Sequence, residues 1–256
     1  MTEFQTWNAG GETISIRKHL RVPMRDGVEL AADAYAAPGD EPRPALVALS
    51  PYGKELQALA LTTPPQKRPS PMWDGCIEAG DIARVVREGY VHVIGDLRGS
   101  GASGGEHIGN YNAGGVPLGE DAYDFIEWVA AQPWCDGNVG MIGISGFAMT
   151  QMLAALETPP HLKAIFPVAT TVDLWEATWH HGLFSSTFMS SWLAGVGSLA
   201  DKLDETFRSW PVQLVERVLK APVLHDRFAH WNGEAALSLL GGALRGSYDP
   251  SWDELF

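Results

Sequence analysis

The architecture of this chain follows from one segment, Asn138-Val139-Gly140-Met141-Ile142-Gly143-Ile144-Ser145-Gly146-Phe147-Ala148-Met149. A short apolar run leads into Ser145, and helix-forming residues follow from Ala148. A strand, a sharp turn with a serine at its apex and a helix are the layout of a nucleophile elbow. Such a turn exposes the serine hydroxyl to a base and places it at a helix N-terminus, where backbone N–H groups stabilise an oxyanion.

The segment departs from the general pattern G-x-S-x-G at its last glycine, which is replaced by Phe147. Gly143, two residues before the serine, meets the need for a small residue where strand and helix nearly touch. Taken alone, the segment also fits an ordinary strand-to-helix turn with a solvent-facing serine. The rest of the chain distinguishes these two interpretations.

Composition limits the classes of function open to this chain. Its 256 residues suit one large domain or two ordinary ones, and 45% hydrophobic with 19% charged residues is typical of a globular protein. The net charge of −13 argues against nucleic acid or an anionic membrane as a partner. The N-terminus is polar and no apolar run is long enough to span a membrane, so we expect a soluble, cytoplasmic protein. Cys76 and Cys135 are far apart and do not indicate a disulfide scaffold.

Strands and helices are expected to alternate along the first part of the chain. The turn Met24-Arg25-Asp26-Gly27 predicts a hairpin, because Asp-Gly between alternating apolar runs is typical of one. Because most strands are nearly all apolar, we predict an α/β fold with a mostly parallel sheet covered on both faces, made mixed by this hairpin. The expected strands are 13–22, 28–36, 44–49, 91–94, the run before Ser145 and 162–168, and the expected helices are 80–88, 120–131 and the one after the elbow.

The character of the sequence changes after Thr171. Residues 172–256 hold six of the ten tryptophans and no convincing strand. We therefore expect two units, an α/β core over residues 1–171 and a helical region over residues 172–256, with 211–220 as one of its helices.

Six motifs occur together along the chain in a characteristic order. The set resembles the N-terminal part of the cocaine-esterase-like and X-Pro dipeptidyl-peptidase-like serine hydrolases, an α/β-hydrolase family, and covers residues 14 to about 182 almost continuously. The motifs are Val22-Pro23-Met24-Arg25-Asp26-Gly27-Val28, Pro51-Tyr52-Gly53-Lys54, Gly89-Tyr90-Val91 running into Asp96-Leu97-Arg98-Gly99-Ser100-Gly101, Glu120-Asp121-Ala122-Tyr123-Asp124, Gln132-Pro133-Trp134-Cys135-Asp136-Gly137-Asn138-Val139-Gly140 and the elbow itself.

This resemblance implies that Ser145 is the nucleophile of an acyl-enzyme mechanism. The family elbow usually reads G-x-S-Y followed by small residues, whereas here Gly146 stands at the tyrosine position and Ala148 at a glycine position. The resemblance assigns the oxyanion hole to the Gly146 backbone N–H and the Tyr52 hydroxyl, because a phenol at the end of a neighbouring strand can reach the developing charge. The alternative for Tyr52 is a ring that packs on its own loop. No cofactor and no metal are expected.

The family also places a helical cap over the active site, in the region that follows Thr171. Trp175 and Trp179 are candidates for roofing an apolar acyl pocket, and packing within the cap is the alternative for each. His180 and His181 are adjacent and would point in different directions on a helix, so we interpret residues 179–184 as cap structure rather than a metal site.

The glycine-rich segment Asp96-Leu97-Arg98-Gly99-Ser100-Gly101 invites comparison with nucleotide-binding loops. It lacks the G-x-G-x-x-G spacing and the P-loop lysine followed by serine or threonine. We therefore expect the segment to be scaffold, and Arg98 to make structural hydrogen bonds.

A serine hydrolase also needs a histidine base and an acid that orients it. In the family both follow strands beyond the cap, and Tyr248-Asp249-Pro250-Ser251-Trp252-Asp253-Glu254-Leu255 is similar to the segment just before them. The chain ends at Phe256, so we expect the later strands, the acid, the histidine and the family's C-terminal β-sandwich domain to be missing. Asp173, His225 and His230 are the candidates for substitutes within the chain.

The sequence thus predicts a serine acyl hydrolase that attacks a small-molecule ester, amide or peptide through Ser145, in a chain truncated before the triad acid and histidine. The alternative is a catalytically inactive remnant or subunit that acts as an interaction module. We also expect self-association or a complementing C-terminal chain, because a sheet that ends at residues 162–168 leaves one strand edge unpaired. Turnover of an aryl ester by the isolated chain would separate these alternatives.

Overall fold

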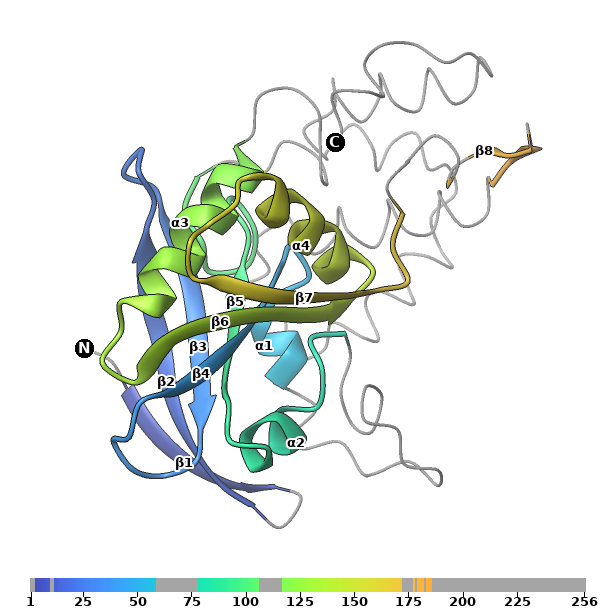
Figure 1. The fold of residues 1–256 in the computed structure, drawn as a ribbon. Coiled ribbons are helices and arrows are strands. Elements are labelled where there is room, and N and C mark those ends of the chain that lie inside the picture. The colour runs from blue at the N-terminus through green and yellow to red at the C-terminus, as the bar shows by residue number, and fades with distance from the viewer. Residues whose placement is uncertain are drawn as a thin grey trace, which may run out of the picture.

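A seven-stranded mixed sheet forms the centre of the protein (Figure 1). The computed structural model describes residues 3–9, 12–58, 78–105, 117–171, 177, 179–181 and 183–185. The strand order is β1-β2-β3-β5-β4-β6-β7. The strands are β1 (Glu3–Ala9), β2 (Glu12–Pro23), β3 (Glu29–Ala36), β4 (Arg43–Ser50), β5 (Val91–Asp96), β6 (Cys135–Ile144) and β7 (Leu162–Val168). The helices are α1 (Lys54–Gln57), α2 (Ile82–Arg87), α3 (Leu118–Ala130) and α4 (Gly146–Leu156).

The sheet is half antiparallel and half parallel. The pairs β1–β2, β2–β3 and β3–β5 are antiparallel, whereas β5–β4, β4–β6 and β6–β7 are parallel. The predicted mixed α/β sheet with a leading hairpin is therefore confirmed. More of the strand pairs are antiparallel than expected, because the polar N-terminal segment forms an additional strand, β1. The sequence did not indicate this strand.

The hairpin between β2 and β3 turns where Asp-Gly predicts it. The backbone N–H of Met24 donates to the carbonyl of Val28 (2.8 Å), and Gly27 adopts a φ of 88° that favours glycine. The Asp26 carboxylate accepts the Val28 N–H at 3.0 Å. These contacts fix the turn locally, which explains why the sequence alone was sufficient to place it.

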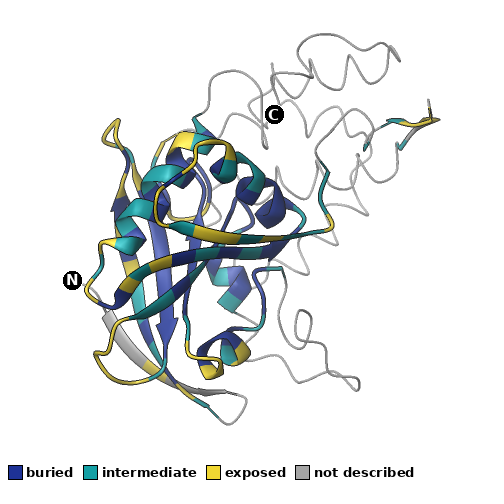
Figure 2. Cartoon of the chain, in the orientation of Figure 1, coloured by how far each residue is buried: buried dark blue, intermediate teal, exposed yellow. Residues whose placement is uncertain are grey.

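The strands bury side chains on both faces, and helices cover each face (Figure 2). Residues alternate in direction along a strand, so that Val47 and Leu49 of β4 face one core cluster and Ala48 faces the other. The first cluster includes apolar residues of α3 and α4, and the second includes Ile82 and Val86 of α2. Figure 1 shows α3 and α4 on the opposite side of the sheet from α2.

The strand β7 is more exposed than the sequence suggested. We expected a buried strand at 162–168, and this was wrong, because Phe166 is 63% exposed and Lys163 and Ala164 are also exposed. The reason is position, since β7 pairs with β6 on one side and is the last strand of the described sheet.

Beyond the core, the described residues form a small hairpin. β8 (Trp179–His180) pairs with β9 (Leu183–Phe184) in antiparallel register. The expectation of no strand after Thr171 is therefore wrong at this point. The predictions for Asp173, Trp175, residues 211–220, His225 and His230 lie outside the described residues, as does Cys76.

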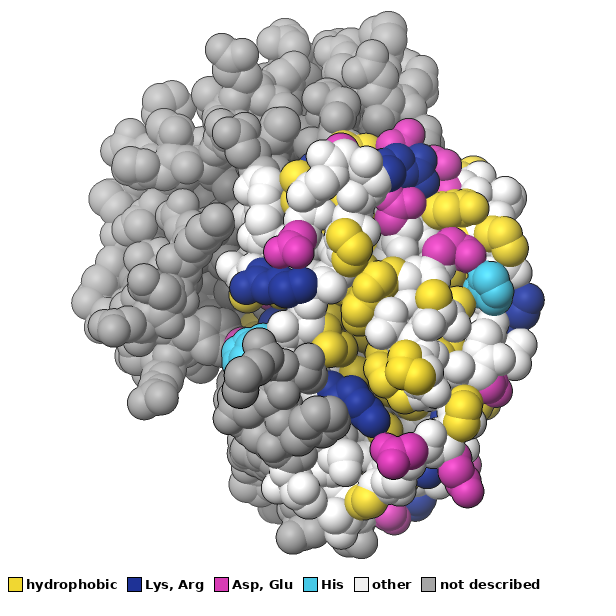
Figure 3. Space-filling model, turned by 90° about the vertical axis from the view of Figure 1, so that its left-hand side faces the viewer, with side chains coloured by type: hydrophobic (Ala, Val, Ile, Leu, Met, Phe, Trp, Pro, Cys, Tyr) yellow, Lys and Arg dark blue, Asp and Glu magenta, His cyan; other side chains and the backbone are white. Residues whose placement is uncertain are grey.

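The described surface carries charges of both signs. On the face drawn in Figure 3, most basic side chains lie beside acidic ones, with apolar side chains between them. No helix in the described part of the chain has the length and apolar character needed to cross a membrane.

Candidate active site

Ser145 lies on a strained turn between β6 and α4. Its φ of 57° and ψ of −117° are a combination that L-residues rarely adopt, at a cost on the order of 1–3 kcal/mol. The Ser145 N–H donates to the Val168 carbonyl (2.9 Å), and the Ser145 carbonyl accepts the Met149 N–H (3.0 Å) at the start of α4. The backbone therefore has the strand–turn–helix form that the sequence predicted for a nucleophile elbow.

The elbow closes around Gly143 and Phe147. Gly143 has a φ of 137°, and a Cβ at this position would lie 2.3 Å from the Phe147 Cβ. The Phe147 side chain is 1% exposed and packs in the second core cluster. The prediction that position 143 needs a small residue is confirmed, and the phenylalanine that breaks the general motif fills the space beside it.

The neighbours of the elbow hold it by neutral hydrogen bonds. The Ile144 N–H donates to the Glu78 carbonyl at 3.1 Å. Gln151 of α4 donates from Nε2 to the Gly143 carbonyl (3.3 Å), and its Oε1 accepts the Phe166 N–H of β7 (2.9 Å). Strand β6, helix α4 and strand β7 are thereby joined around Ser145 without an ion pair among these contacts.

Gly146 is the first residue of α4 and is buried. Amides in the first turn of a helix have no carbonyl acceptor within that helix, and the helix dipole adds positive potential there. The Gly146 N–H is therefore chemically suited to stabilise an oxyanion formed at Ser145. Its role as a donor stays a prediction.

Tyr52 follows β4 and lies against the elbow. Its side chain is mostly buried, and its ring makes an edge-on contact with Phe147 at a centroid distance of 5.9 Å and an interplanar angle of 76°. The Tyr52 N–H donates to Ser50 Oγ at 3.1 Å. The structure thus brings Tyr52 next to the residue that lies two positions after Ser145, while the oxyanion role of its hydroxyl stays a prediction.

A buried lysine stands two residues after Tyr52. Lys54 is 1% exposed, and its Nζ lies 3.1 Å from Asp33 Oδ2 and 2.6 Å from Glu55 Oε1. Burial alone would lower the pKa of Lys54, but the two carboxylates outweigh burial and raise its pKa above the usual value. Lys54 is therefore held in its charged form.

Asp96 ends β5 and accepts hydrogen bonds from two loops. Its Oδ1 accepts the Lys54 N–H, and its Oδ2 accepts the Ala102 N–H at 2.9 Å. Burial raises the pKa of Asp96 to about 6, although these amides and the Lys54 charge oppose the shift. A Cβ at position 101 would lie 2.2 Å from Asp96 Oδ2, so Gly101 makes this close approach to the loop possible.

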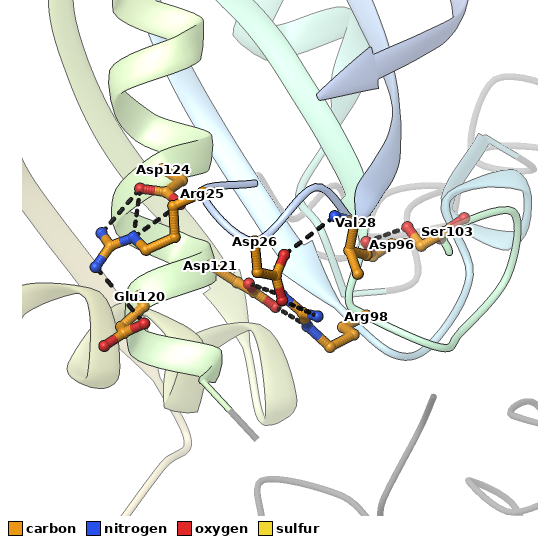
Figure 4. Close-up of polar contacts among 9 residues, drawn as sticks. All are labelled: Arg25, Asp26, Val28, Asp96, Arg98, Ser103, Glu120, Asp121 and Asp124. Atoms are coloured by element: carbon orange, nitrogen blue, oxygen red, sulfur yellow. Dashed lines mark hydrogen bonds and ion pairs between the residues drawn. The ribbon is translucent and has the colours of Figure 1, made fainter. Parts of the chain in front are cut away.

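Arg98 makes structural contacts, as the sequence predicted (Figure 4). Its guanidinium binds Asp121 of α3 through Nε (2.8 Å) and Nη2 (2.6 Å), and Nη1 donates to Asp26 at 2.6 Å. Beside it, Arg25 of the hairpin turn binds Asp124 of α3. These contacts join the loop after β5, the hairpin turn and α3. None of them involves Ser145.

Glu78 is a titratable residue whose backbone contacts the elbow, since its carbonyl accepts the Ile144 N–H. The Glu78 N–H donates to Gln57 Oε1 at 2.8 Å, whereas its own Oε2 is buried with no partner among the described residues. Burial raises the pKa of Glu78 to about 7. Nearby in the sheet, burial lowers the pKa of His92 to about 4, so its ring is neutral.

The described residues do not supply a base for Ser145. None of their histidines is hydrogen-bonded to it: His161 pairs with Glu127 at 2.7 Å, and His180 and His181 are exposed on the β8–β9 hairpin. Trp179, a predicted pocket residue, is half-buried on the same hairpin. The Trp179 pocket role stays a prediction.

One group of side chains has donor atoms close enough for a metal, but its chemistry does not fit. Donor atoms of His19, Asp33 and Glu55 lie within 4.8 Å of one another. The ammonium groups of Lys54 and Lys18 already neutralise these carboxylates, with Lys18 Nζ 3.0 Å from Glu55 Oε2. A further cation would meet two positive charges there, so we assign this cluster to ion pairing.

Sequence reasoning missed Lys54 and Glu78 as neighbours of the site. Lys54 belongs to the motif Pro51-Tyr52-Gly53-Lys54, and a charged residue at the end of a buried strand is the signal that could have identified it. Glu78 belongs to none of the motifs, and its burial depends on contacts that a sequence pattern does not reveal.

Comparison with known proteins gives a consistent result. A family model described as X-Pro dipeptidyl-peptidase (S15 family) matches residues 26–231. Cocaine esterase from Rhodococcus sp. (strain MB1 Bresler) is 35% identical over 216 residues, which are 83% of this chain and 33% of that protein. This chain therefore spans about a third of the length of that curated relative.

Solved structures show the same fold. A CocE/NonD family hydrolase from Staphylococcus aureus aligns with a TM-score of 0.66 at 24% identity, over 98% of this chain and 40% of that one. An aminopeptidase from the marine sediment archaeon Thaumarchaeota archaeon aligns with a TM-score of 0.67 at 21% identity, over 99% of this chain and 40% of that one. The α/β-hydrolase core predicted from the sequence is confirmed.

Proposed function

Because this chain belongs to the X-Pro dipeptidyl-peptidase (S15) family of serine hydrolases, we propose that it supplies the nucleophile and oxyanion hole for ester hydrolysis through an acyl-enzyme on Ser145. The observation that carries the proposal is the backbone of Ser145, with φ 57° and ψ −117° at the N-terminus of α4. A non-glycine residue keeps such strain where its surroundings enforce it, and a serine held in this way is typical of a hydrolase nucleophile.

In the proposed reaction, Ser145 Oγ attacks the ester carbonyl carbon while its proton passes to a histidine base. The carbonyl oxygen becomes an oxyanion, which the Gly146 N–H and the Tyr52 hydroxyl stabilise. Collapse of this intermediate expels the alcohol, which takes the proton from the base and leaves Ser145 acylated. Water, deprotonated by the same base, then releases the carboxylic acid and restores the serine.

Ester cleavage is favoured within the range of family reactions because the relative at 35% identity is an esterase. A small ester with an apolar acyl group would suit a pocket roofed by Trp175 and Trp179. The proposal requires no cofactor, because the nucleophile, base and oxyanion donors together account for each bond made and broken.

The base and its acid would come from residues other than the described ones. Support comes from the absence of a histidine bonded to Ser145 in the described part of the chain, and from the length of the relative, of which this chain matches 33%. Strand β7 offers a place for such a segment, because it carries the exposed Phe166 at the end of the described sheet. We propose that a complementing C-terminal chain, or a second copy, covers this edge.

Sedimentation of the purified 256-residue chain tests this part of the proposal. We expect self-association that a complementing chain with the family's later strands suppresses. A compact monomer with a cooperative melt and steady ester turnover would contradict it, and would place the base and acid within this chain.

The alternative function is an interaction module without catalysis, which the lack of a described histidine at Ser145 also supports. Hydrolysis of p-nitrophenyl acetate distinguishes the two, with the chain measured alone and co-expressed with a chain that carries the family's later strands, acid and histidine. The enzyme proposal expects turnover in the co-expressed form that Ser145→Ala abolishes. A stable complex without turnover would favour the interaction module.

A further inference from the structure

The turn that carries Tyr52 is anchored on both sides by buried polar groups. It begins at Ser50, the last residue of β4, whose Oγ accepts the Tyr52 N–H at 3.1 Å. It ends at Lys54, where α1 starts, after Gly53 with a φ of 87°. Tyr52 thus lies between a hydroxyl that accepts its own amide and a lysine two residues later.

Lys54 joins this turn to two other strands of the sheet. Its backbone N–H donates to Asp96 Oδ1 at the end of β5, the strand that pairs with β4. Its side chain reaches β3, where Nζ lies 3.1 Å from Asp33 Oδ2. The lysine is 1% exposed and Asp33 is 0% exposed, so this ion pair is buried.

Asp33, which binds the Lys54 ammonium, and Asp96, which accepts the Lys54 N–H, are themselves fixed. Asp33 Oδ1 accepts the His19 N–H at 2.9 Å, at the point where β2 shifts register and His19 adopts a φ of 58°. Asp96 Oδ2 accepts the Ala102 N–H of the next loop. The anchor is therefore a rigid part of the sheet rather than a pair of mobile side chains.

We propose that Lys54 is the positioning residue of the oxyanion hole: by pairing its ammonium with Asp33 and donating its amide to Asp96, it holds the Tyr52 turn in the conformation in which the phenol hydroxyl can reach the oxyanion formed by attack of Ser145. The proposal rests on the proposed function in assigning the hydroxyl to the oxyanion. Its structural half, that Lys54 sets the conformation of Tyr52, stands without that assignment.

A buried ion pair suits this purpose better than an apolar contact would. An apolar side chain can slide among similar neighbours, whereas a displaced ammonium would leave Asp33 charged and uncompensated in the core. One conformation of the turn is therefore strongly favoured. Preorganised donors of this kind are what oxyanion stabilisation requires.

The structural half is tested by fluorine NMR of the 256-residue chain labelled with 3-fluorotyrosine. The chain has six tyrosines, and loss of one signal in Tyr52→Phe assigns its resonance. The test variant is Asp33→Asn with Lys54→Met, which removes both buried charges together, while Glu55 keeps Lys18 as its partner at 3.0 Å. We expect the single Tyr52 line to broaden or split in this variant, while the line of Tyr123 on α3 is unchanged.

Lys18→Met is the matched control. Lys18 belongs to β2, and its ammonium lies 3.0 Å from Glu55 and 3.8 Å from Asp33, two carboxylates that also pair with the Lys54 ammonium. We expect its Tyr52 line to stay single and narrow. An unchanged Tyr52 line in a folded Asp33→Asn/Lys54→Met protein would overturn the proposal.

The catalytic half is tested in the active, complemented form with a double-mutant cycle. Removing the pair should lower kcat by roughly 10- to 100-fold with little change in KM, as expected when a catalytic group is misplaced by about 1 Å. In a Tyr52→Phe background the same change should lower kcat by less than about twofold. Equal losses in both backgrounds would show that the lysine acts on the fold at large.

The two halves separate failure of this inference from failure of the proposed function. If Ser145→Ala leaves turnover intact, the proposed function is wrong, and the fluorine spectra still determine whether Lys54 positions Tyr52. If turnover depends on Ser145 and the spectra do not change, the proposed function stands and Lys54 has no positioning role.

Discussion

The elbow at Ser145 and the turn at Tyr52 lie in contact, yet they are held in opposite ways. Neutral hydrogen bonds and the buried ring of Phe147 hold the elbow, whose strain is local to one residue. Buried charges hold the Tyr52 turn, through Lys54 and its carboxylate partners. The difference means that the position of the nucleophile depends on shape, whereas the position of the proposed oxyanion donor depends on ion pairing.

This separation has a physical advantage. A strained backbone needs close packing, which charged groups disturb because they require partners or water. The Tyr52 turn is instead joined to two strands through Lys54, whose ammonium pairs with Asp33 of β3 and whose amide binds Asp96 of β5. Substitutions should therefore divide into those that act through volume at the elbow and those that act through charge at the turn.

Gly143→Ala should have the largest effect, because it adds a methyl group to the close packing of the elbow. The added methyl group would lie 2.3 Å from the Phe147 Cβ at a φ of 137°, so we expect a loss of roughly 3–5 kcal/mol in unfolding free energy. Urea denaturation measures it. Gly89→Ala is the control, because its φ of 89° is also positive but no atom lies within 4 Å of the new methyl group. Equal losses in both variants would mean that strain, not packing, dominates.

Tyr52→Phe should have the next largest effect, on catalysis rather than on stability. Removal of one oxyanion donor lowers kcat by roughly 10²–10³-fold, which we expect in the complemented enzyme. The edge-on contact with Phe147 is kept, so the melting temperature should change little. An unchanged kcat would show that the ring serves for packing alone.

Glu78→Gln tests the claim that the elbow is held without charge. The pKa of Glu78 is raised by burial from 4.5 to about 7, so the folded protein prefers its neutral form. Below pH 4.5 the carboxyl is neutral in both the folded and the unfolded state, so it does not lower the free energy of unfolding. As pH rises from 4.5 to about 7 the unfolded state ionises first, so the free energy of unfolding falls, and the loss is full above pH 7. The glutamine variant should therefore be more stable than the parent by roughly 3 kcal/mol at pH 8 and nearly equal to it at pH 4.

Chemical denaturation across pH 4–8 gives this profile. Glu88→Gln, which replaces an exposed carboxylate at the end of α2, should stay within about 0.5 kcal/mol of the parent throughout. A pH-independent difference for Glu78→Gln would mean that its carboxyl is solvated.

Lys18→Met should have the smallest effect. Its side chain is 16% exposed and its closer partner Glu55 is 40% exposed, so solvent screens the pair. We expect a loss of less than about 1 kcal/mol by thermal denaturation. A loss of several kcal/mol would show that ion pairing stabilises β2 as well as the Tyr52 turn.

The sequence was sufficient for elements whose signals are local. The Asp-Gly turn, the apolar strands and the elbow all depend on neighbouring residues, and β7 begins and ends where it was expected. Strand β1 was missed because Glu3–Ala9 is polar and is held by pairing with β2 alone among the described strands. The exposure of β7 was also missed, because the number of neighbours a strand has is a property of the sheet.

The candidate site was predicted in part for the same reason. Ser145, Gly146 and Tyr52 belong to motifs that can be recognised along the chain, and the structure brings the Tyr52 ring against Phe147, two residues after Ser145. The motif that contains Lys54 does not indicate its burial, which depends on pairing with Asp33, 21 residues earlier in sequence and on another strand. Pairwise contacts of this kind carry no periodic signal.

Mass-spectrometric mapping of a fluorophosphonate adduct tests the acyl-enzyme assignment. The reagent is added to the 256-residue chain with and without the complementing chain, beside Ser145→Ala. We predict one adduct, on the peptide that contains Ser145, which forms when the base is supplied and is lost in the alanine variant. An adduct on another serine, with Ser145 unmodified under both conditions, would contradict the account.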